Sequence, residues 1–238
     1  HIKNYNSINE IYKTKIALYE YTNNKGIAFI NNDNVILNNN IIKSKTIQFS
    51  IKDNVNNRTN KNIIIPDHLT HLKDVIKSIY IICNTLNIED IIINNALKSF
   101  SLPSGRGNII KYKNYCIIDD SYNANPKSVE FAINRLNKIK TKGKKILVFG
   151  DMLELGKKKL IEHKEISKLI NKSNIDIILT YGNLAEHTNK NINKSKFSKH
   201  YTNITKLKIE LNNIVSDHDC VYLKGSRSME LERVYKFQ

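Results

Sequence analysis

Short apolar runs alternate with amphipathic stretches along the second half of the chain. The runs at residues 115–118, 145–149, 175–179 and 220–223 are rich in β-branched residues, which is typical of strands buried in a sheet. Helical spacing of apolar residues follows from Pro126, at residues 160–170 and at 206–214. A short helix, a weak strand at 197–201 and a last helix from about Met229 complete the pattern. This alternation predicts an α/β fold with βαβ crossovers and a mainly parallel sheet.

The first hundred residues have a less regular pattern. We predict helices at residues 8–19, 68–86 and 88–100, and strands at 26–30, 46–51 and 62–65. Pro103, Gly105 and Gly107 interrupt the periodicity that precedes them. We therefore place a domain boundary there, with one domain at residues 1–102 and a second at 103–238.

Composition narrows the class of protein. The 238 residues carry a formal net charge of +16 and are 40% hydrophobic, as in soluble globular proteins. No apolar run is long enough to cross a bilayer, and the polar start does not resemble a signal peptide. The three cysteines fit neither a zinc site nor a disulfide framework, so we expect a reducing cytoplasm. The chain begins with His rather than Met, which suggests a piece of a longer protein.

The excess of lysine has two interpretations. A basic chain can bind nucleic acid, but these lysines are scattered and no aromatic residues alternate with them as a base-stacking surface requires. Scattered charge usually forms a solvated surface, and Asn, Ile and Lys dominate the whole composition. We therefore expect no nucleic-acid partner and no membrane partner, although a basic surface still attracts polyanionic substrates.

Polar residues follow each predicted strand of the second half. The strand at 115–118 runs into Asp119 and Asp120, then into a polar turn with Tyr122, and Asn125-Pro126 opens a helix. Carboxylates at a strand end can accept hydrogen bonds from ribose hydroxyls, and an aromatic ring can stack on a base. From spacing alone, a well-capped turn explains these residues about as well as a nucleotide site does.

Four ordered blocks resemble the Mur ligase family, in the branch that adds D-alanyl-D-alanine. Residues 119–126 read Asp-Asp-Ser-Tyr-Asn-Ala-Asn-Pro, which is similar to the family signature. Gly105-Arg106-Gly107 resembles the Gly-Arg linker before the last domain. Residues 147–156, with His163 beyond them, resemble the Gly-Asp-Met-x-Glu-Leu-Gly block, and residues 224–232 resemble the terminal Lys-Gly-Ser-Arg block.

The resemblance is weaker upstream. His1, Ser7 and Lys15 are similar to a family His followed by a Ser and a Lys on the next helix, and residues 31–34 resemble an Asn-x-Asp segment. Two departures stand out. Leu69 and Leu72 occupy positions where the family has Asn, the second of which contacts adenine. No Gly-Lys-Thr/Ser phosphate loop occurs in the chain, so we expect that it cannot hydrolyse ATP alone.

The resemblance implies a fold and an activity. Residues 1–102 would be a truncated part of the family's central ATPase domain, followed by a Rossmann-like carboxyl-terminal domain. The family's enzymes use ATP and Mg²⁺ to activate the terminal carboxylate of UDP-MurNAc-tripeptide as an acyl phosphate. The amine of D-Ala-D-Ala then attacks it. We expect a monomeric cytoplasmic enzyme of peptidoglycan precursor synthesis.

The resemblance also implies roles for individual residues. Asp119 would bind the ribose of ATP, with Tyr122, Asn123 and Asn125 near the nucleotide. Arg106 and Lys15 would be catalytic, with Arg106 near the phosphates. His1 and a carbamylated Lys15 would hold Mg²⁺. The expected substrate-binding residues are Asp151, Glu154, Lys224, Ser226 and Arg227. The turn at 224–227 is expected to open a helix whose amides favour an anion, or to be a helix cap with two surface cations. Glu154 could equally be a first-turn helix residue, and His163 is expected to be structural.

Other functions compete with this one. The two leucines, the missing phosphate loop and the biased composition are also compatible with a non-catalytic remnant or binding module of the same family. A folylpolyglutamate synthase-like ligase is another member of the superfamily, but the blocks at 121–126 and 224–227 count against it. A nucleic-acid binder has only net charge in its favour.

Overall fold

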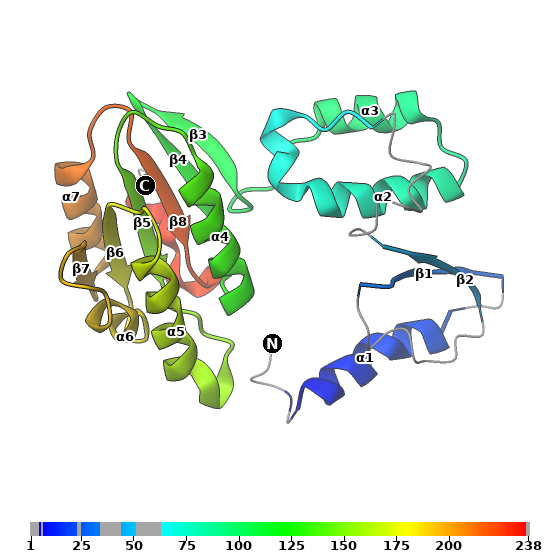
Figure 1. The fold of residues 1–238 in the computed structure, drawn as a ribbon, viewed down its shortest axis with the longest axis horizontal. Helices are drawn as coiled ribbons and strands as arrows, with labels where there is room; N and C mark the ends of the chain where they lie inside the picture. Colours follow the sequence, from blue (N-terminus) through cyan, green and yellow to red (C-terminus); the bar gives the residue numbers. More distant parts are fainter. Residues whose placement is uncertain (1–4, 6, 23–24, 34–43, 51–62, 237–238) are drawn as a thin grey trace. The chain divides into compact units, whose positions relative to one another are not determined.

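The computed structural model describes residues 5, 7–22, 25–33, 44–50 and 63–236. The chain divides into two compact units, Asn4–Ser101 and Leu102–Gln238 (Figure 1). We call them the amino-terminal and the carboxyl-terminal unit.

The amino-terminal unit contains helices and one small parallel sheet. Helix α1 (Ile8–Glu20) begins at Ser7, whose hydroxyl accepts a hydrogen bond from the Glu10 amide at 3.3 Å, as expected of an N-cap residue. Strands β1 (Ile27–Asn31) and β2 (Lys45–Phe49) pair in parallel. A 3₁₀ helix, η3 (Asp67–Leu72), then leads into α2 (Lys73–Thr85) and α3 (Asp90–Ser99).

The carboxyl-terminal unit is built on a six-stranded sheet with the order β3-β4-β8-β5-β6-β7. Strands β4 to β8 run parallel, and only β3 is antiparallel, to its neighbour β4. The strands are β3 (Asn108–Tyr112), β4 (Tyr115–Asp120), β5 (Lys145–Gly150), β6 (Ile177–Tyr181), β7 (Phe197–Tyr201) and β8 (Cys220–Lys224). The last strand is therefore inserted between the first two parallel strands.

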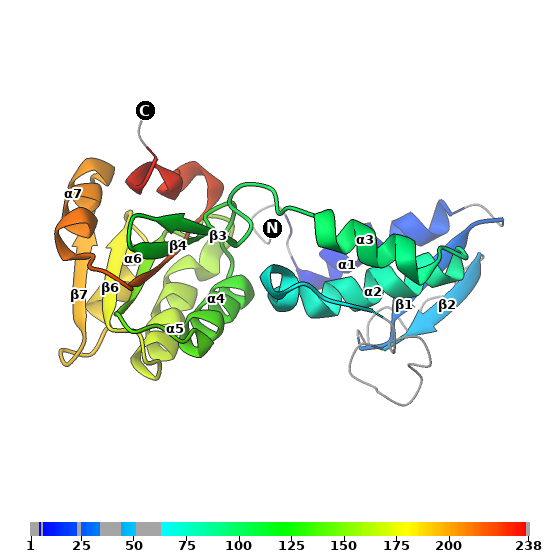
Figure 2. The same ribbon diagram turned by 90° about the horizontal axis from the view of Figure 1, so that it is seen from above.

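Helices cover both faces of this sheet (Figure 2), so the central strands are largely buried on both sides, whereas the edge strands β3 and β7 are partly exposed. One face packs against α4 (Pro126–Lys138), α5 (Lys159–Asn171) and α6 (Ala185–Lys190) around Phe149 and Tyr222. The other packs against α7 (Ile204–Ile214) and the short 3₁₀ helix η6 (Leu231–Val234) around Val221 and Leu223. This double burial explains why the strands read as continuous apolar runs rather than as alternating patterns.

The predicted α/β class and mainly parallel sheet are confirmed, and three local predictions are wrong. Residues 63–65 of the strand predicted at 62–65 are irregular, while residue 62 lies outside the described residues. The helix predicted from Met229 is instead two short 3₁₀ helices, η5 (Arg227–Met229) and η6, separated by Glu230 at a φ of 47°. A left-handed residue cannot continue an α-helix. Strand β3 was not predicted, because its alternation is short.

No helix among the described residues is long and apolar enough to span a membrane.

Candidate functional site

Three of the sequence blocks meet at the carboxyl ends of three adjacent strands. The Asp119–Pro126 block begins in the last residues of β4, the Lys224–Arg227 block begins at the last residue of β8, and the Gly150–Gly156 block begins at the last residue of β5. These strands are neighbours in the order β4-β8-β5. After β5 the chain continues into α5 on one face of the sheet, and after β8 it continues into η6 on the opposite face. In open parallel sheets, ligands bind at the carboxyl ends of strands where the connections change face in this way. This edge is therefore the candidate site.

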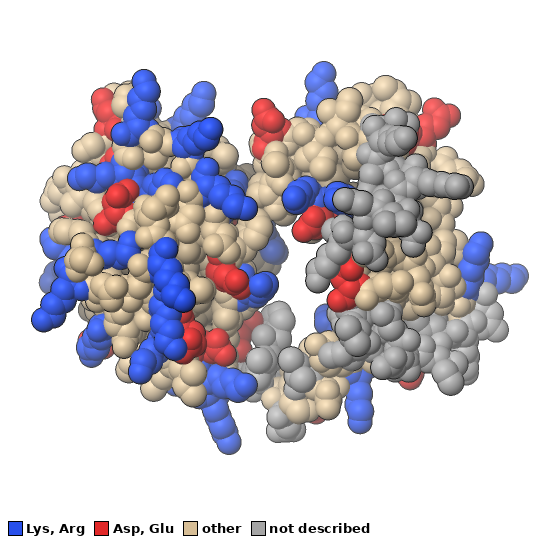
Figure 3. All heavy atoms as spheres, viewed as in Figure 1, with Lys and Arg blue, Asp and Glu red and all other residues tan. Residues whose placement is uncertain are grey.

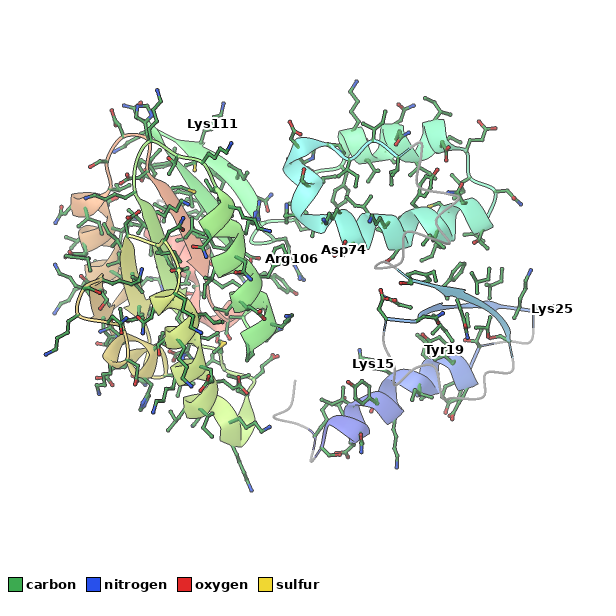
Figure 4. All side chains as sticks on the ribbon, viewed as in Figure 1. Lys15, Tyr19, Lys25, Asp74, Arg106 and Lys111 are labelled. Atoms are coloured by element: carbon green, nitrogen blue, oxygen red, sulfur yellow. The ribbon has the colours of Figure 1, made fainter. Side chains whose placement is uncertain are left out.

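Arg106 and Tyr122 form a stacked pair at the start of this unit (Figure 4 labels Arg106). The guanidinium carbon of Arg106 lies 3.5 Å from the centroid of the Tyr122 ring. The backbone holds the two segments together, because the Tyr122 amide donates to the Gly105 carbonyl at 3.0 Å. Gly105 has a φ of 76°, and a Cβ there would lie 3.1 Å from the Tyr122 nitrogen. Both side chains of the pair are exposed, so they can meet a ligand.

The two adjacent carboxylates at the end of β4 have different surroundings. Asp119 is 1% exposed. Its Oδ1 accepts from the Ser121 hydroxyl at 2.6 Å, and its Oδ2 accepts from the Tyr235 hydroxyl at 2.8 Å. Asp120 is more accessible and forms an ion pair of 2.8 Å with Lys224. The expected ribose contact of Asp119 stays a prediction, but both of its oxygens already have protein donors.

Lys224 lies inside the unit rather than on its surface, with 3% of its area exposed. Burial raises the pKa of the Asp120 carboxyl, and the Lys224 ammonium and the Tyr222 hydroxyl, at 3.2 Å, oppose that shift. A buried ammonium without such a partner would be strongly unfavourable. The expected substrate contact of Lys224 is not tested, and the geometry shows the residue neutralising Asp120.

Asp151 and Ser226 join the loops that follow β5 and β8. The Asp151 Oδ1 accepts from the Leu184 and Ala185 amides, at 3.0 and 2.7 Å, at the start of α6. The Ser226 amide donates to the Asp151 carbonyl at 2.9 Å, and the Ser226 Oγ accepts from the Leu153 amide at 2.9 Å. Both side chains are buried. They fix the shape of this edge, and their expected contacts with substrate remain predictions.

Arg227 and Glu154 are the more accessible members of the predicted substrate set. Arg227 is exposed, and its Nη1 lies 2.6 Å from the Glu232 Oε1. Glu154 is half-buried in the loop after β5. The expectation of a helix dipole at 224–227 is wrong, because the residues that follow form a single 3₁₀ turn. Of the two cations in this block, Lys224 is buried and Arg227 is exposed.

Asn123 and Asn125 shape the turn into α4. The Asn123 Oδ1 accepts from the Ala124 amide at 2.8 Å. The Asn125 Oδ1 accepts from the Ser128 amide at 2.9 Å, while the Ser128 hydroxyl accepts from the Asn125 amide at 3.0 Å. This reciprocal capping box fixes the start of α4. The predicted capping role of Asn125 is therefore present, and its nucleotide contact is not tested.

His163 is a buried residue of α5 that forms a hydrogen bond with the backbone of the Gly150–Gly156 loop. Its Nε2 accepts from the Met152 amide at 3.1 Å, and its Nδ1 lies 3.1 Å from the Thr188 hydroxyl, which itself donates to the His163 carbonyl. Burial lowers the pKa of His163 to about 4, with a further contribution from His187. The imidazole is therefore neutral at pH 7, with its proton on Nδ1, and it acts as a scaffold for the loop.

Residues predicted in the amino-terminal unit have a different status. His1 lies outside the described residues. Lys15 is exposed on α1 (Figure 4). Leu69 is 1% exposed and Leu72 is half-buried, both in η3. Among the described residues, no group of three or more His, Cys, Asp or Glu side chains could hold a metal ion. The predicted Mg²⁺ site of His1 and carbamylated Lys15 is not tested by this search, because His1 lies outside the described residues.

Two residues of this edge were missed by the sequence analysis. Arg135 on α4 donates from Nη1 to the Gly107 carbonyl at 3.1 Å and so anchors the Gly-Arg-Gly segment. Tyr235 donates its hydroxyl to Asp119 across 116 positions of sequence. Arg135 lies near the carboxyl end of α4, where basic residues are common in any helix, so its sequence position does not indicate a contact with Gly107. Tyr235 lies in a segment that was predicted as helix, and nothing in the sequence indicates its contact with Asp119.

Known proteins resemble this chain over different lengths. The family model described as Mur ligase, glutamate ligase domain matches residues 105–227. A UDP-N-acetylmuramoyl-tripeptide–D-alanyl-D-alanine ligase of Buchnera aphidicola (from Baizongia pistaciae) is 30% identical over 98% of this chain and 55% of its own length. The ligase of the same name from Bacillus subtilis is 40% identical over 50% of this chain and 27% of its own length. The chain thus spans about half or less of these relatives.

Solved structures share the fold. The MurF ligase of Thermotoga maritima, determined in complex with ADP, superposes with a TM-score of 0.77 at 22% identity over 98% of this chain and 58% of that one. A MurF structure from Acinetobacter baumannii superposes with a TM-score of 0.81 at 18% identity, and the match covers 98% of this chain and 56% of that one. A bifunctional folylpolyglutamate synthase/dihydrofolate synthase from Yersinia pestis superposes with a TM-score of 0.58 at 15% identity, and the match covers 81% of this chain and 47% of that one. Because the family model covers the three strand-end blocks and more than half of the chain, the chain belongs to the Mur ligase family.

Proposed function

We propose that this chain is the carboxyl-terminal portion of an ATP-dependent ligase that joins D-alanyl-D-alanine to UDP-MurNAc-tripeptide through an acyl phosphate. The observation that carries the proposal is the meeting of three sequence blocks at the ends of β4, β8 and β5. The printed names of the relatives describe this reaction for those proteins. The relatives are about twice as long as the stretch that this chain matches.

The residues at this edge fit a nucleotide. ATP, when bound, would supply the phosphoryl group that turns a poorly reactive carboxylate into an electrophile. Tyr122 offers a flat exposed ring, and Arg106 offers a fixed cation whose planar fork suits phosphate oxygens. Of the two carboxylates, Asp120 is the more accessible and is the better placed to accept from a ribose hydroxyl. The Lys224 ammonium opposes the rise that burial causes in the pKa of the Asp120 carboxyl.

The fit is incomplete for Mg²⁺. The described residues hold no cluster of ligands for it, so no step is assigned to the metal. A catalytic role for Lys15 and a metal role for His1 and Lys15 remain predictions. The same holds for a cytoplasmic location and a monomeric state.

A non-catalytic remnant of the same family is the second candidate, and Leu72 is the observation that favours it. This half-buried side chain in η3 stands where the resemblance places the Asn that contacts adenine. A leucine side chain cannot form a hydrogen bond with a base. If this helix is required for adenine binding, the affinity for ATP is reduced or lost.

The deciding experiment measures ATP-dependent phosphate release by the longest natural polypeptide that contains this chain. UDP-MurNAc-tripeptide and D-Ala-D-Ala are supplied together and separately, and the 238-residue chain is assayed alongside. We expect release only with both substrates and only from the longer polypeptide. A folded longer polypeptide that includes an intact phosphate loop but releases no phosphate would contradict the ligase function and support the remnant.

A further inference from the structure

A second concavity lies at the opposite end of the sheet from the candidate site. Its volume is about 470 Å³, and its lining includes Lys111, Lys113, Lys140, Lys142, His218 and Cys116. Lys111 lies on β3 (Figure 4). We call this feature the lysine pocket. None of the four blocks that resemble the ligase family contributes a residue to it.

Three connections build the lysine pocket, all at the end of the sheet where the parallel strands begin. They are the β3–β4 turn, the α4–β5 connection and the α7–β8 connection (Figure 1). The His218 amide donates to the Asn114 carbonyl at 2.8 Å, and the Thr141 hydroxyl donates to the His218 carbonyl. These two hydrogen bonds link the three connections to one another, and both of them have a backbone carbonyl as the acceptor. The positions of the connections therefore do not depend on the long lysine side chains.

The charge in the lysine pocket is not compensated locally. All four lysines are exposed, and no carboxylate in the described part of the chain forms an ion pair with any of them. The one acidic residue in the lining, Asp219, is 2% exposed and forms no ion pair with these lysines. Its Oδ1 accepts from the Lys144 amide at 2.6 Å and its Oδ2 from the Ser216 amide at 2.8 Å. The lining therefore carries four exposed lysines against one buried carboxylate.

Figure 3 shows the charge on the visible face of the carboxyl-terminal unit, where basic side chains are spread widely with acidic ones between them. Some lysines elsewhere pair with nearby carboxylates, as Lys127 does with Glu130 and Lys199 with Glu210. Scattered lysines are solvated and need no ligand, whereas four lysines around one hollow repel one another unless an anion binds.

We propose that the lysine pocket binds a small polyphosphate anion. Several ammonium groups can each contact a different phosphate oxygen as point charges, so an anion with two or more phosphates matches the lining better than a single phosphate. The compact shape favours a small molecule over a nucleic acid, which needs an extended groove with successive stacking rings. This inference goes beyond the ligase function and does not depend on it.

The test is calorimetric titration of the 238-residue chain with inorganic tripolyphosphate at low salt. The variant Lys140→Gln/Lys142→Gln removes two pocket charges. The control Lys164→Gln/Lys206→Gln removes two exposed charges from α5 and α7. We expect saturable binding by the unmodified chain, weakened about tenfold or more in the pocket variant and about twofold or less in the control. Equal weakening in both variants would mean diffuse attraction to net charge and would overturn the proposal.

Cys116 provides an independent readout, because it lines the lysine pocket and is half-buried. A hydrogen bond from the Cys220 thiol lowers the pKa of Cys116 against the opposing effect of burial, and a lowered thiol pKa favours alkylation by iodoacetamide. Saturating tripolyphosphate should slow alkylation of Cys116 but not of Cys83, as followed by peptide mass spectrometry. Unchanged alkylation of Cys116 would contradict the proposal. Tighter binding of a single-stranded oligonucleotide through the same lysines would also overturn it, in favour of nucleic acid.

Discussion

The Arg106 guanidinium lies flat against the Tyr122 ring, with its central carbon 3.5 Å from the ring centroid. This contact joins the Gly-Arg-Gly segment to the turn after β4. It presents a cation and an aromatic surface at one place on the sheet edge. A ligand with both a phosphate and a base would meet the two together.

Arg106→Lys tests whether the flat stack matters beyond its charge. We expect this variant to lower kcat/KM for ATP about tenfold or more in the complete ligase, because lysine keeps the charge but loses the planar fork. Tyr122→Phe, the matched control, keeps the ring and should change kcat/KM less than about twofold. Steady-state phosphate release measures both. Equal loss in the two variants would show that the Tyr122 hydroxyl, not the stack, is what the reaction requires.

Removing Lys224 should destabilise the fold strongly. Lys224→Met leaves the Asp120 carboxylate partly buried without its counter-charge, and we expect a loss of about 3–5 kcal/mol in the free energy of unfolding. Asp120→Asn/Lys224→Met should recover most of that loss, because no uncompensated charge remains. Urea unfolding followed by circular dichroism measures both variants. A double variant as unstable as the single one would show that the lysine stem, rather than the ion pair, holds this edge together.

Asp151→Asn separates a structural role from a substrate role. Asparagine keeps an oxygen that can accept from the Leu184 and Ala185 amides, so we expect a stability change of about 1 kcal/mol or less. Asp151→Ala should cost about 1–2 kcal/mol, because it removes the acceptor at the start of α6. Thermal unfolding gives both values. A rise in KM for D-Ala-D-Ala in the complete ligase with Asp151→Asn, at unchanged stability, would instead show that the charge contacts substrate.

His163 makes stability depend on pH in a defined window. Its folded pKa of about 4 lies below the usual value of 6.5, so the unfolded chain binds more protons between these values. Its contribution is therefore complete above about pH 6.5 and is lost as the pH falls toward 4, by about 2 kcal/mol at pH 5. Urea unfolding at pH 7.5 and pH 5.0 should show that loss.

The control for this prediction compares two histidine variants. His163→Asn should flatten the difference between the two pH values, whereas His218→Asn changes an exposed histidine and should leave it intact. Asparagine tolerates the φ of 66° at position 218. A His163 variant with the same pH dependence as the unmodified chain would contradict the assigned protonation state.

The fold of the carboxyl-terminal unit was largely predictable because its central strands are buried on both faces. Continuous β-branched runs therefore located the four central strands, although β6 begins two residues later than predicted. The edge strand β7 gave only a weak signal, and the edge strand β3 was missed. The order of the strands was not predictable. The chain sequence gives no sign that β8 lies between β4 and β5, since that placement depends on how α7 crosses the opposite face of the sheet.

The candidate site was predictable in its blocks but not in the contacts of single residues. A motif residue near a strand end can contact a ligand directly, or it can fix the conformation of a loop whose other residues contact the ligand. Asp119, Lys224 and Ser226 are all buried and bonded to protein groups, whereas Arg106 and Tyr122 are exposed. Partners such as Tyr235 lie more than a hundred positions away, and sequence spacing carries no information about such pairs.

The insertion of β8 between β4 and β5 has a consequence for synthesis of the protein. A ribosome makes β4 about a hundred residues and β5 about seventy residues before Cys220, so the two strands have no partner in common while the intervening helices emerge. The sheet, and with it the edge that bears all three blocks, can close only when β8 has been made. A premature stop before Cys220 would remove a central strand rather than an edge, and the product would expose two apolar strand margins to other unfinished chains.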